Sequence, residues 1–420
     1  METDRSTPAT APVSGAPLPV GTRLLHIGPH APGTASVQGA LFAAKDAMAA
    51  RGVDFPAHGG HPVEAALAVC GRPGMTGDAR PDERHWRRLL DAVHATGGRT
   101  SLISSEFFAD APDDATVARI VDDLVRDRDR DRDSDRDSDR DSDRDSDRDG
   151  DRDRLHVLVT LSPLATIMPS QWQQYVQNGL RTGYEDWLDH MLRRAPYEKP
   201  TPSFWRRHRH DRLVERWVRV VGAGNITVAV VDDRDRGGLT RTFESLLALP
   251  RGLLAEVPDA TRRSLTSAET EMLRILNREF RGNGLPDEIY SKLVRNGAVP
   301  RMRKSCRPSS DDIGINTPVW ALEAAAAIGE EMTERIGATG VRVLGDPAPL
   351  SAVPPSSPLG PARTTPRIDP EAAAQALYGA LAVVAAESVR ATTIRSVHQT
   401  PSGELVRVLG HRMLKRMKRR

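Results

Sequence analysis

The chain contains little cysteine and no recognisable secretion signal. Cys70 and Cys306 are the two cysteines in 420 residues, which provide neither a disulfide framework nor a zinc cluster. We therefore expect no metal site and a reducing compartment. The first residues, Met-Glu-Thr-Asp, lack the basic and apolar segments of a signal peptide. Together these absences predict a cytoplasmic protein.

Long apolar runs and a strong net charge are also absent. No segment approaches the ~20 apolar residues of a membrane-spanning helix. The formal net charge is only +2, which argues against a nucleic-acid-binding role for the chain as a whole. Residues 126–154 hold 14 aspartates and 10 arginines, a net charge of −4, so the rest of the chain carries +6. Such a mildly basic body suits an anionic cofactor.

The segment 126–154 repeats Arg-Asp and Asp-Ser-Asp-Arg units, with no apolar side chain between Val125 and Leu155. A segment without apolar side chains has nothing to bury in a core. We interpret it as a low-complexity insert, solvated within a tolerant surface loop. An RNA-binding tract is the alternative interpretation.

Composition also marks the two ends of the chain. Residues 1–21 are rich in Pro, Ala, Thr and Ser and are predicted to be a disordered tail. Residues 22–345 form the main domain, and the Pro/Ser-rich residues 346–368 a linker. Residues 369–420 hold an Ala-rich helix and a basic end. That end either stays in solvent or contacts an acidic membrane surface or a nucleic acid.

Within the main domain, apolar strand-like segments alternate with helical ones. Strands are expected at Leu24–Gly28, Thr100–Ser104, Leu155–Leu161, Ile226–Val231 and Val341–Leu344. Helices are expected at Ala35–Arg51, Pro81–Thr96, Asp114–Val125, Pro169–Leu180, Asp211–Val221, Leu239–Leu249, Ser267–Arg281 and Pro318–Ile336. Strands without polar alternation predict a parallel sheet covered on both faces. We expect a three-layer α/β domain of the P-loop kind, which binds ligands at the carboxyl ends of its strands.

The first expected strand runs into a glycine- and proline-containing loop and then a helix. Backbone N–H groups at a helix start favour an anion, and Gly33 permits close approach of a phosphate. Thr34 and Ser36 add hydroxyl donors. Walker A loops carry a lysine, but this loop has none, because Ala31 and Pro32 follow His30. An ordinary tight βα turn is the alternative to a phosphate site.

Two further strands end in chemically interesting residues. Ser104-Ser105-Glu106-Phe107-Phe108 ends one, and Ser162 follows another, ahead of Ser170 on a helix. With the first loop, these segments resemble the bacterial sulfotransferases that use phosphoadenosine phosphosulfate (PAPS). The resemblance covers about Leu24 to Asp346 without the insert. It implies sulfuryl transfer from PAPS to a hydroxyl or amine of a small molecule or glycan.

The resemblance also implies roles for individual residues. In that family the first loop reads Lys-Thr-Gly-Thr-Thr after His-Ile-Gly. Gly28, Gly33 and Thr34 match this pattern, whereas Ala31 stands in place of the lysine, and Pro32 and Ala35 in place of threonines. An arginine and a serine of the later strand–helix hold the 3′-phosphate. Ser162 replaces that arginine, and Ser170 matches the serine. Both cationic contacts to PAPS or to its product PAP are therefore missing.

Sulfuryl transfer needs a base for the acceptor's proton. Glu106 is the candidate, since the resemblance places a glutamate there and Phe107 and Phe108 would desolvate it. A helix N-terminal carboxylate or a salt-bridged surface group is the alternative. His30 is the second candidate base, or a phosphate donor in place of the lysine.

Other basic and aromatic residues are weaker candidates. Lys199, Arg206 and Arg207 lie in a Pro-containing stretch that is either a lid over an anionic ligand or a solvated helix start. The resemblance suggests Arg263 and Ser264 as a late basic contact to the nucleotide. Ser170 either binds the 3′-phosphate or caps its own helix. The aromatic side chains that form either an acceptor wall or core are Trp172, Tyr175, Tyr184 and Trp187.

Two functions therefore stay open. The first is a PAPS-dependent sulfotransferase with degenerate cofactor contacts, and the second is a non-catalytic binding protein that keeps the fold. A P-loop kinase is disfavoured, because Gly-Lys-Ser/Thr is absent and Asp232 and Asp233 are the sole candidate Mg²⁺ carboxylates after a strand.

Overall fold

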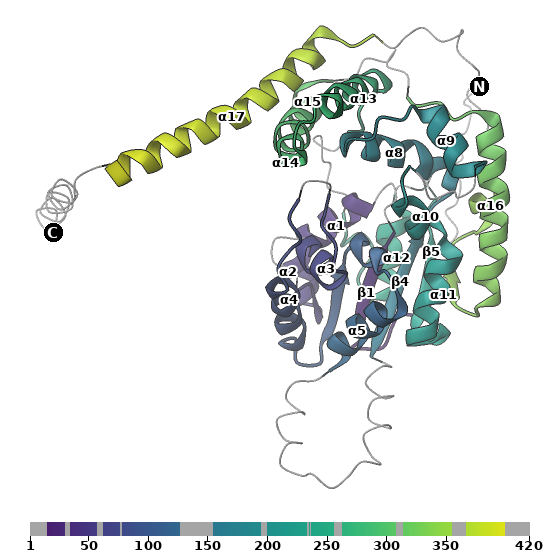
Figure 1. The fold of residues 1–420 in the computed structure, drawn as a ribbon. Coiled ribbons are helices and arrows are strands. Elements are labelled where there is room, and N and C mark those ends of the chain that lie inside the picture. The colour runs from purple at the N-terminus through teal and green to yellow at the C-terminus, as the bar shows by residue number, and fades with distance from the viewer. Residues whose placement is uncertain are drawn as a thin grey trace, which may run out of the picture.

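The computed structural model describes residues 15–29, 34–56, 62–75, 78–126, 154–194, 200–232, 235, 237–255, 263–307, 314–354 and 367–399. Six parallel strands form one sheet in the order β2-β3-β1-β4-β5-β6 (Figure 1). The strands are β1 (Arg23–Gly28), β2 (Val53–Asp54), β3 (Thr100–Ser104), β4 (Leu155–Leu161), β5 (Ile226–Val230) and β6 (Arg342–Leu344). The α/β class and the parallel sheet are confirmed. The two-residue edge strand β2 was not expected.

Successive residues of β1 supply the cores on the two faces of the sheet. Leu24 packs with α1 (Thr34–Ala43), α2 (Lys45–Ala49) and α12 (Gly238–Leu246). Leu25, one position on, packs on the opposite face. The helices that cover this second face are α3 (Val63–Val69), α4 (Arg84–His94), α5 (Asp114–Val125) and α11 (His210–Val221). Both residues are fully buried, as expected for a strand covered on both faces.

A separate helical layer, with its own apolar core, lies beyond the carboxyl ends of the strands, and β4 leads directly into its first helix (Figure 1). Its helices are α8 (Leu164–Gln177), α9 (Tyr184–Leu192), α10 (Ser203–His208), α13 (Ser267–Gly282), α14 (Asp287–Tyr290), the π-helix η4 (Ser291–Ala298), α15 (Val299–Ser305) and α16 (Val319–Ala338). The described residues also include the short 3₁₀ helices η1 (Glu106–Asp110), η2 (Ala223–Asn225) and η5 (Ala348–Leu350). This layer stands over the sheet edge where a ligand is expected.

The C-terminal helix α17 (Pro370–Gln399) packs one end on this layer and projects away from the body (Figure 1). Gly379 and Gly297 of η4 meet so closely that a Cβ on Gly379 would clash with the Gly297 carbonyl oxygen. The predicted Ala-rich helix is therefore present. The basic end beyond it lies outside the described residues. No described helix is both long and apolar enough to cross a bilayer.

Several expected boundaries are wrong. The first helix is split into α1 and α2 at Ala44, and α3 was missed. Residues 15–21, expected in a disordered tail, are held by backbone contacts, because Leu18 N donates to Leu246 O at 2.9 Å. Residues 1–14 and the insert from 127 to 153 lie outside the described residues. Of the predicted linker, residues 346–354 are ordered around η5, whose Leu350 is buried.

Candidate functional site

The loop after β1 is described at its two ends. Gly28 ends the strand with φ +79°, a conformation that favours glycine. Helix α1 begins at Thr34, one residue before the predicted start at Ala35, and Ser36 in its first turn is exposed. His30 and Gly33 lie outside the described residues, and of Thr34 and Ala35 only the backbone is described. The phosphate-binding role of this loop stays a prediction.

A buried polar network joins the carboxyl ends of β4, β1 and β3. His26 on the central strand places its Nδ1 2.8 Å from Ser104 Oγ of β3 and its Nε2 3.3 Å from Thr160 Oγ1 of β4. Gln38 Nε2 of α1 lies 3.5 Å from Ser104 Oγ and donates to Glu106 Oε2 at 2.9 Å. The network therefore runs across three neighbouring strands and ends at the predicted base.

Strand register explains why these side chains meet. His26 pairs with Ser104 in the parallel ladder between β1 and β3, so both point to the same face of the sheet. The His26 ring packs edge-on against Phe243 of α12 at 5.2 Å, which closes the network from that side. The buried polar groups thus satisfy one another at the sheet edge.

Glu106 is the first residue of η1, directly after β3. Ser105 caps this short helix, since its side chain accepts from Phe107 N at 3.4 Å. Glu106 is partly exposed, whereas Phe108 is fully buried against Trp86, with ring centroids 6.2 Å apart. Phe108 therefore belongs to the core beneath η1. Glu106 lies at the start of a helix, as the alternative of a helix N-terminal carboxylate predicted. It also accepts the hydrogen bond from Gln38 that joins it to the polar network.

A buried ion pair ties the last residue of η1 to α10. Arg207 Nε and Nη2 each lie 2.6 Å from an Asp110 carboxylate oxygen, in a bidentate arrangement. Burial by itself lowers the pKa of Arg207, but the charge and hydrogen bonds of Asp110 outweigh it and raise that pKa above its ordinary value. Arg207 is therefore fixed at the last residue of η1, where the negative charge of Glu106 also acts on it. The interpretation of this segment as a solvated helix start is wrong for Phe204 and Arg207.

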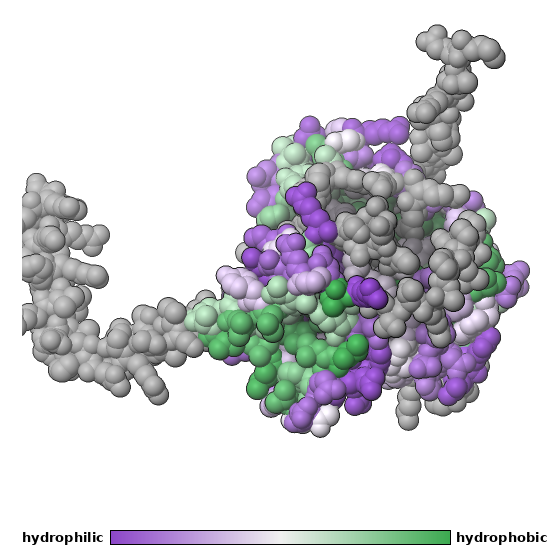
Figure 2. All heavy atoms as spheres, turned by 90° about the horizontal axis from the view of Figure 1, so that it is seen from above, coloured by the Kyte–Doolittle hydropathy of each residue, from purple (hydrophilic) through white to green (hydrophobic). Residues whose placement is uncertain are grey.

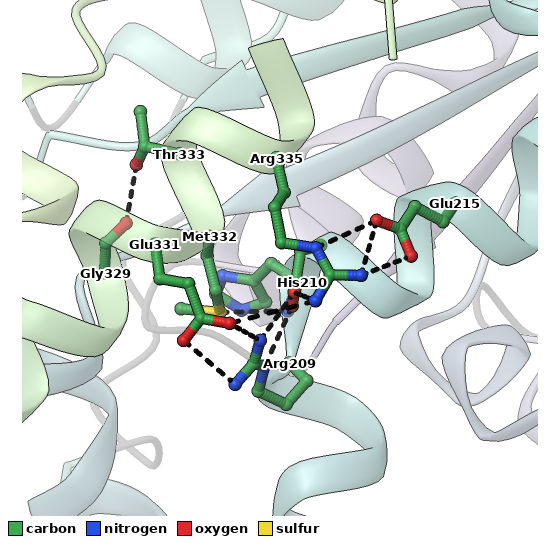
Figure 3. A network of polar contacts seen from close by, with 9 residues as sticks. Arg209, His210, Glu215, Gly329, Glu331, Met332, Thr333 and Arg335 are labelled. Carbon is green, nitrogen blue, oxygen red and sulfur yellow. Dashed lines mark hydrogen bonds and ion pairs between the residues drawn. The ribbon is translucent and has the colours of Figure 1, made fainter. Parts of the chain in front are cut away.

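A second charge network fixes where α10 ends and α11 begins (Figure 3). Asp211, fully buried, accepts from Arg209 Nη2 at 2.7 Å and pairs with Arg335 of α16 at 3.0 Å. Arg209 also pairs with Glu331, and Arg335 also pairs with Glu215, each at 2.7 Å. Because removing one partner of such a network strands a buried charge, the turn between α10 and α11 is held firmly. The end of α10, the helix that contains Arg206 and Arg207, is thereby fixed in place.

The predicted phosphate-binding serines differ in their surroundings. Ser162 directly follows β4 and is 1% exposed, and its Oγ has no hydrogen-bond partner in the described part of the chain. The expectation that Ser170 begins a helix is wrong. Helix α8 starts at Leu164, because the buried apolar residues after Pro163 already pack as a helix, and Ser170 Oγ donates to Ile167 O at 2.9 Å. Ser170 therefore caps nothing.

Arg263 is engaged by the protein itself. It forms two hydrogen bonds with Glu269, at 2.7 and 2.8 Å, and donates to the carbonyls of Ser264, Met302 and Cys306 at 3.0 Å each. All five N–H donors of the guanidinium are thereby used. Ser264 is exposed, and Thr266 rather than Ser264 caps α13. These contacts leave Arg263 no donor for a nucleotide.

The aromatic residues considered for an acceptor wall form the core of the helical layer. Trp187 is fully buried and stacks near Tyr184, at 6.1 Å, and meets Phe204 edge-on at 5.2 Å. Trp172 is 4% exposed. Tyr175 turns its hydroxyl toward Ser203 Oγ at 3.0 Å, and burial raises its pKa. Core packing therefore accounts for these side chains.

Sequence reasoning missed Gln38 and Asp110. Gln38 lies one residue after Val37 and three before Leu41, both buried, so helical spacing was a signal that it faces inward. Asp110 had no comparable signal, since its role depends on an arginine 97 residues away. Among the described residues, no group of three or more His, Cys, Asp or Glu is placed to hold a metal ion.

Comparison with known proteins gives little further guidance. No family model matches the chain, and no solved structure matches it significantly. The chain is similar to endoribonuclease YbeY from Geobacillus kaustophilus (strain HTA426), with 31% identity over 99 residues. That match covers 23% of this chain and 62% of that protein. It therefore establishes no family for this chain.

Proposed function

We propose that this protein is a sulfotransferase-like enzyme that binds PAPS at the carboxyl edge of its sheet and uses Glu106 as the base. The observation that carries the proposal is the polar network from Thr160 through His26, Ser104 and Gln38 to Glu106. It orients one partly exposed carboxylate against α1, the helix that comes after the central strand. A base fixed in this way can accept the acceptor's proton while backbone N–H groups of the loop hold the donor.

Loss of the two cationic contacts limits the expected affinity for the cofactor. A charge-assisted hydrogen bond contributes roughly 1.5–3 kcal/mol. Without the loop lysine and the strand-end arginine, PAPS binding weakens by about 3–6 kcal/mol, or on the order of 10²–10⁴ in the dissociation constant. Turnover should also fall, because a loop lysine would stabilise the leaving phosphate. The proposed enzyme is therefore slow and binds its cofactor weakly.

Titration calorimetry with PAP tests this proposal directly. We expect weak binding that declines as salt rises, since the interaction is mainly electrostatic. Ala31→Lys with Pro32→Thr should tighten PAP binding at least tenfold. Ser162→Arg is added as a second step, with thermal unfolding as a check, because Ser162 is buried. If the folded variants gain no affinity, the positions inferred from the resemblance are wrong.

The competing function is a protein that binds a ligand at this edge without transferring a group. It predicts PAP or acceptor binding without PAP release from PAPS. Measured turnover with PAPS, dependent on Glu106, separates the two functions.

A further inference from the structure

Four arginines from three parts of the chain gather around the end of η1. Arg207 pairs with the Asp110 carboxylate, and Arg72, which follows α3, donates through Nε to the Asp110 carbonyl at 3.2 Å. Arg216 of α11 donates to the Ala111 carbonyl at 2.8 Å. Arg206 of α10 adjoins Arg207. We call these side chains (Arg72, Arg206, Arg207 and Arg216) the arginine cluster.

Arg206 stands out within the arginine cluster. It is partly buried, and no described residue accepts a hydrogen bond from it or pairs with it. Its pKa is lowered by burial and then by the positive charges of Arg72, Arg207 and Arg216, with Asp110 as the opposing charge. Asp110 is the carboxylate whose charge opposes this repulsion at Arg206, whereas Glu106 also acts on Arg207, and Asp113 and Asp114 act on Arg216. Gathering like charges costs free energy, which an added anion would recover.

The cluster lies on one side of the proposed cofactor site. The loop for the donor follows β1, and Ser162 follows β4, whereas η1 follows β3, on the opposite side of β1 in the sheet. Glu106 begins η1, and Asp110 ends it. Because a base must face the acceptor, groups carried by η1 and packed against it lie on the acceptor's side.

We propose that Arg206, supported by Arg72 and Arg216, binds an oxyanion group of the acceptor, a carboxylate or a sulfate. This rests on the proposed function, since it assigns the acceptor's side of the same site. The guanidinium fork matches such oxyanions in a bidentate arrangement. The acceptor class is therefore a small molecule or glycan that already carries a negative charge, whose hydroxyl or amine Arg206 helps to place before Glu106.

Arginine-specific labelling with phenylglyoxal, read by mass spectrometry on the full-length protein, tests this inference. PAP is kept at saturation, and inorganic sulfate is the probe, at constant ionic strength set with chloride. We expect sulfate to slow labelling of Arg206 by about fivefold or more. Arg212, an exposed arginine on α11, is the internal control and should not change. Arg206→Gln should abolish the protection of Arg72 by sulfate.

Two outcomes would overturn the inference. One is labelling of Arg206 that sulfate does not slow. The other is protection of Arg206 by PAP alone as strong as that by sulfate, which would assign the arginine to the cofactor. Neither of these labelling results is the result expected if the proposed function fails. In that case calorimetry would detect no binding of PAP. An acceptor site should leave PAP affinity within twofold in Arg206→Gln.

Discussion

The side-chain amide of Gln38 donates a 2.9 Å hydrogen bond to Glu106 Oε2 and so joins residues 68 positions apart. Gln38 belongs to the helix that follows the central strand, and Glu106 to the turn that follows its neighbour β3. The same amide nitrogen lies 3.5 Å from Ser104 Oγ. One side chain therefore couples the carboxylate to the helix at the proposed donor site.

Glu106→Gln should reduce turnover with PAPS by roughly 10²–10⁴ while leaving PAP affinity within a few-fold, because glutamine keeps the shape but cannot accept a proton. Steady-state kinetics and calorimetry measure the two effects. Glu334→Gln, an exposed change on α16, is the matched control. Unchanged turnover would move the base to another residue, with His30 next in line. A collapse in stability would instead make Glu106 a structural cap.

Gln38→Met keeps the length of the side chain and removes the donor. It should lower the free energy of unfolding by about 1–2 kcal/mol, since buried polar groups lose a partner. Turnover should fall further than PAP affinity, because Glu106 is no longer oriented. Urea denaturation measures the first effect, and Gln174→Met, a partly exposed change on α8, serves as control. Equal behaviour of both variants would show that the Gln38–Glu106 contact contributes nothing.

Arg207→Met should destabilise the protein by about 3 kcal/mol, because the buried Asp110 carboxylate loses its bidentate partner. Asp110 is 2% exposed, so water cannot replace the arginine well. Adding Asp110→Leu should restore most of the loss. Arg219→Met breaks an exposed pair with Asp114 and should destabilise the protein much less, because water replaces the lost contact. Equal losses in the two arginine variants, measured by urea denaturation, would contradict a special role for the buried pair.

Stability should fall between about pH 6.5 and pH 4. Burial, with a smaller effect of the Arg342 charge, lowers the pKa of His156 to about 4 from its usual 6.5. In that window the unfolded chain binds the proton more readily than the folded chain, so stability rises with pH. His156→Gln should therefore reduce the loss of stability between pH 7 and pH 4.5 by on the order of 2 kcal/mol, which urea denaturation at the two pH values measures.

Replacing residues 127–153 by a short Gly/Ser linker should leave the melting temperature nearly unchanged. The segment contains no apolar side chain to bury on the body. Differential scanning calorimetry of the two proteins checks this. A decrease of several degrees would show that the tract packs against the domain.

The sequence by itself determined the layered α/β fold. Continuous apolar segments such as Leu155–Leu161 predicted buried parallel strands, and that strand was predicted to the residue, because burial on both faces leaves an unbroken local signal. Helices were predicted correctly where the apolar periodicity and the capping residues gave a strong local signal, as for α13, which Thr266 caps. The start of α8 was misplaced at Pro169, since tertiary burial of Leu164 and Ile167 outweighed the helix-breaking tendency of proline.

The tertiary structure alone decided how the site is assembled. Glu106 was recognisable from its place after a strand, but its partner Gln38 and the pairing of Asp110 with Arg207 depend on strand order and on how the turn between α10 and α11 is anchored to α16. Hydrogen bonds and ion pairs act over a few ångströms between residues far apart in the chain. Local sequence patterns carry no record of such distances, so these partners appear only once the chain is folded.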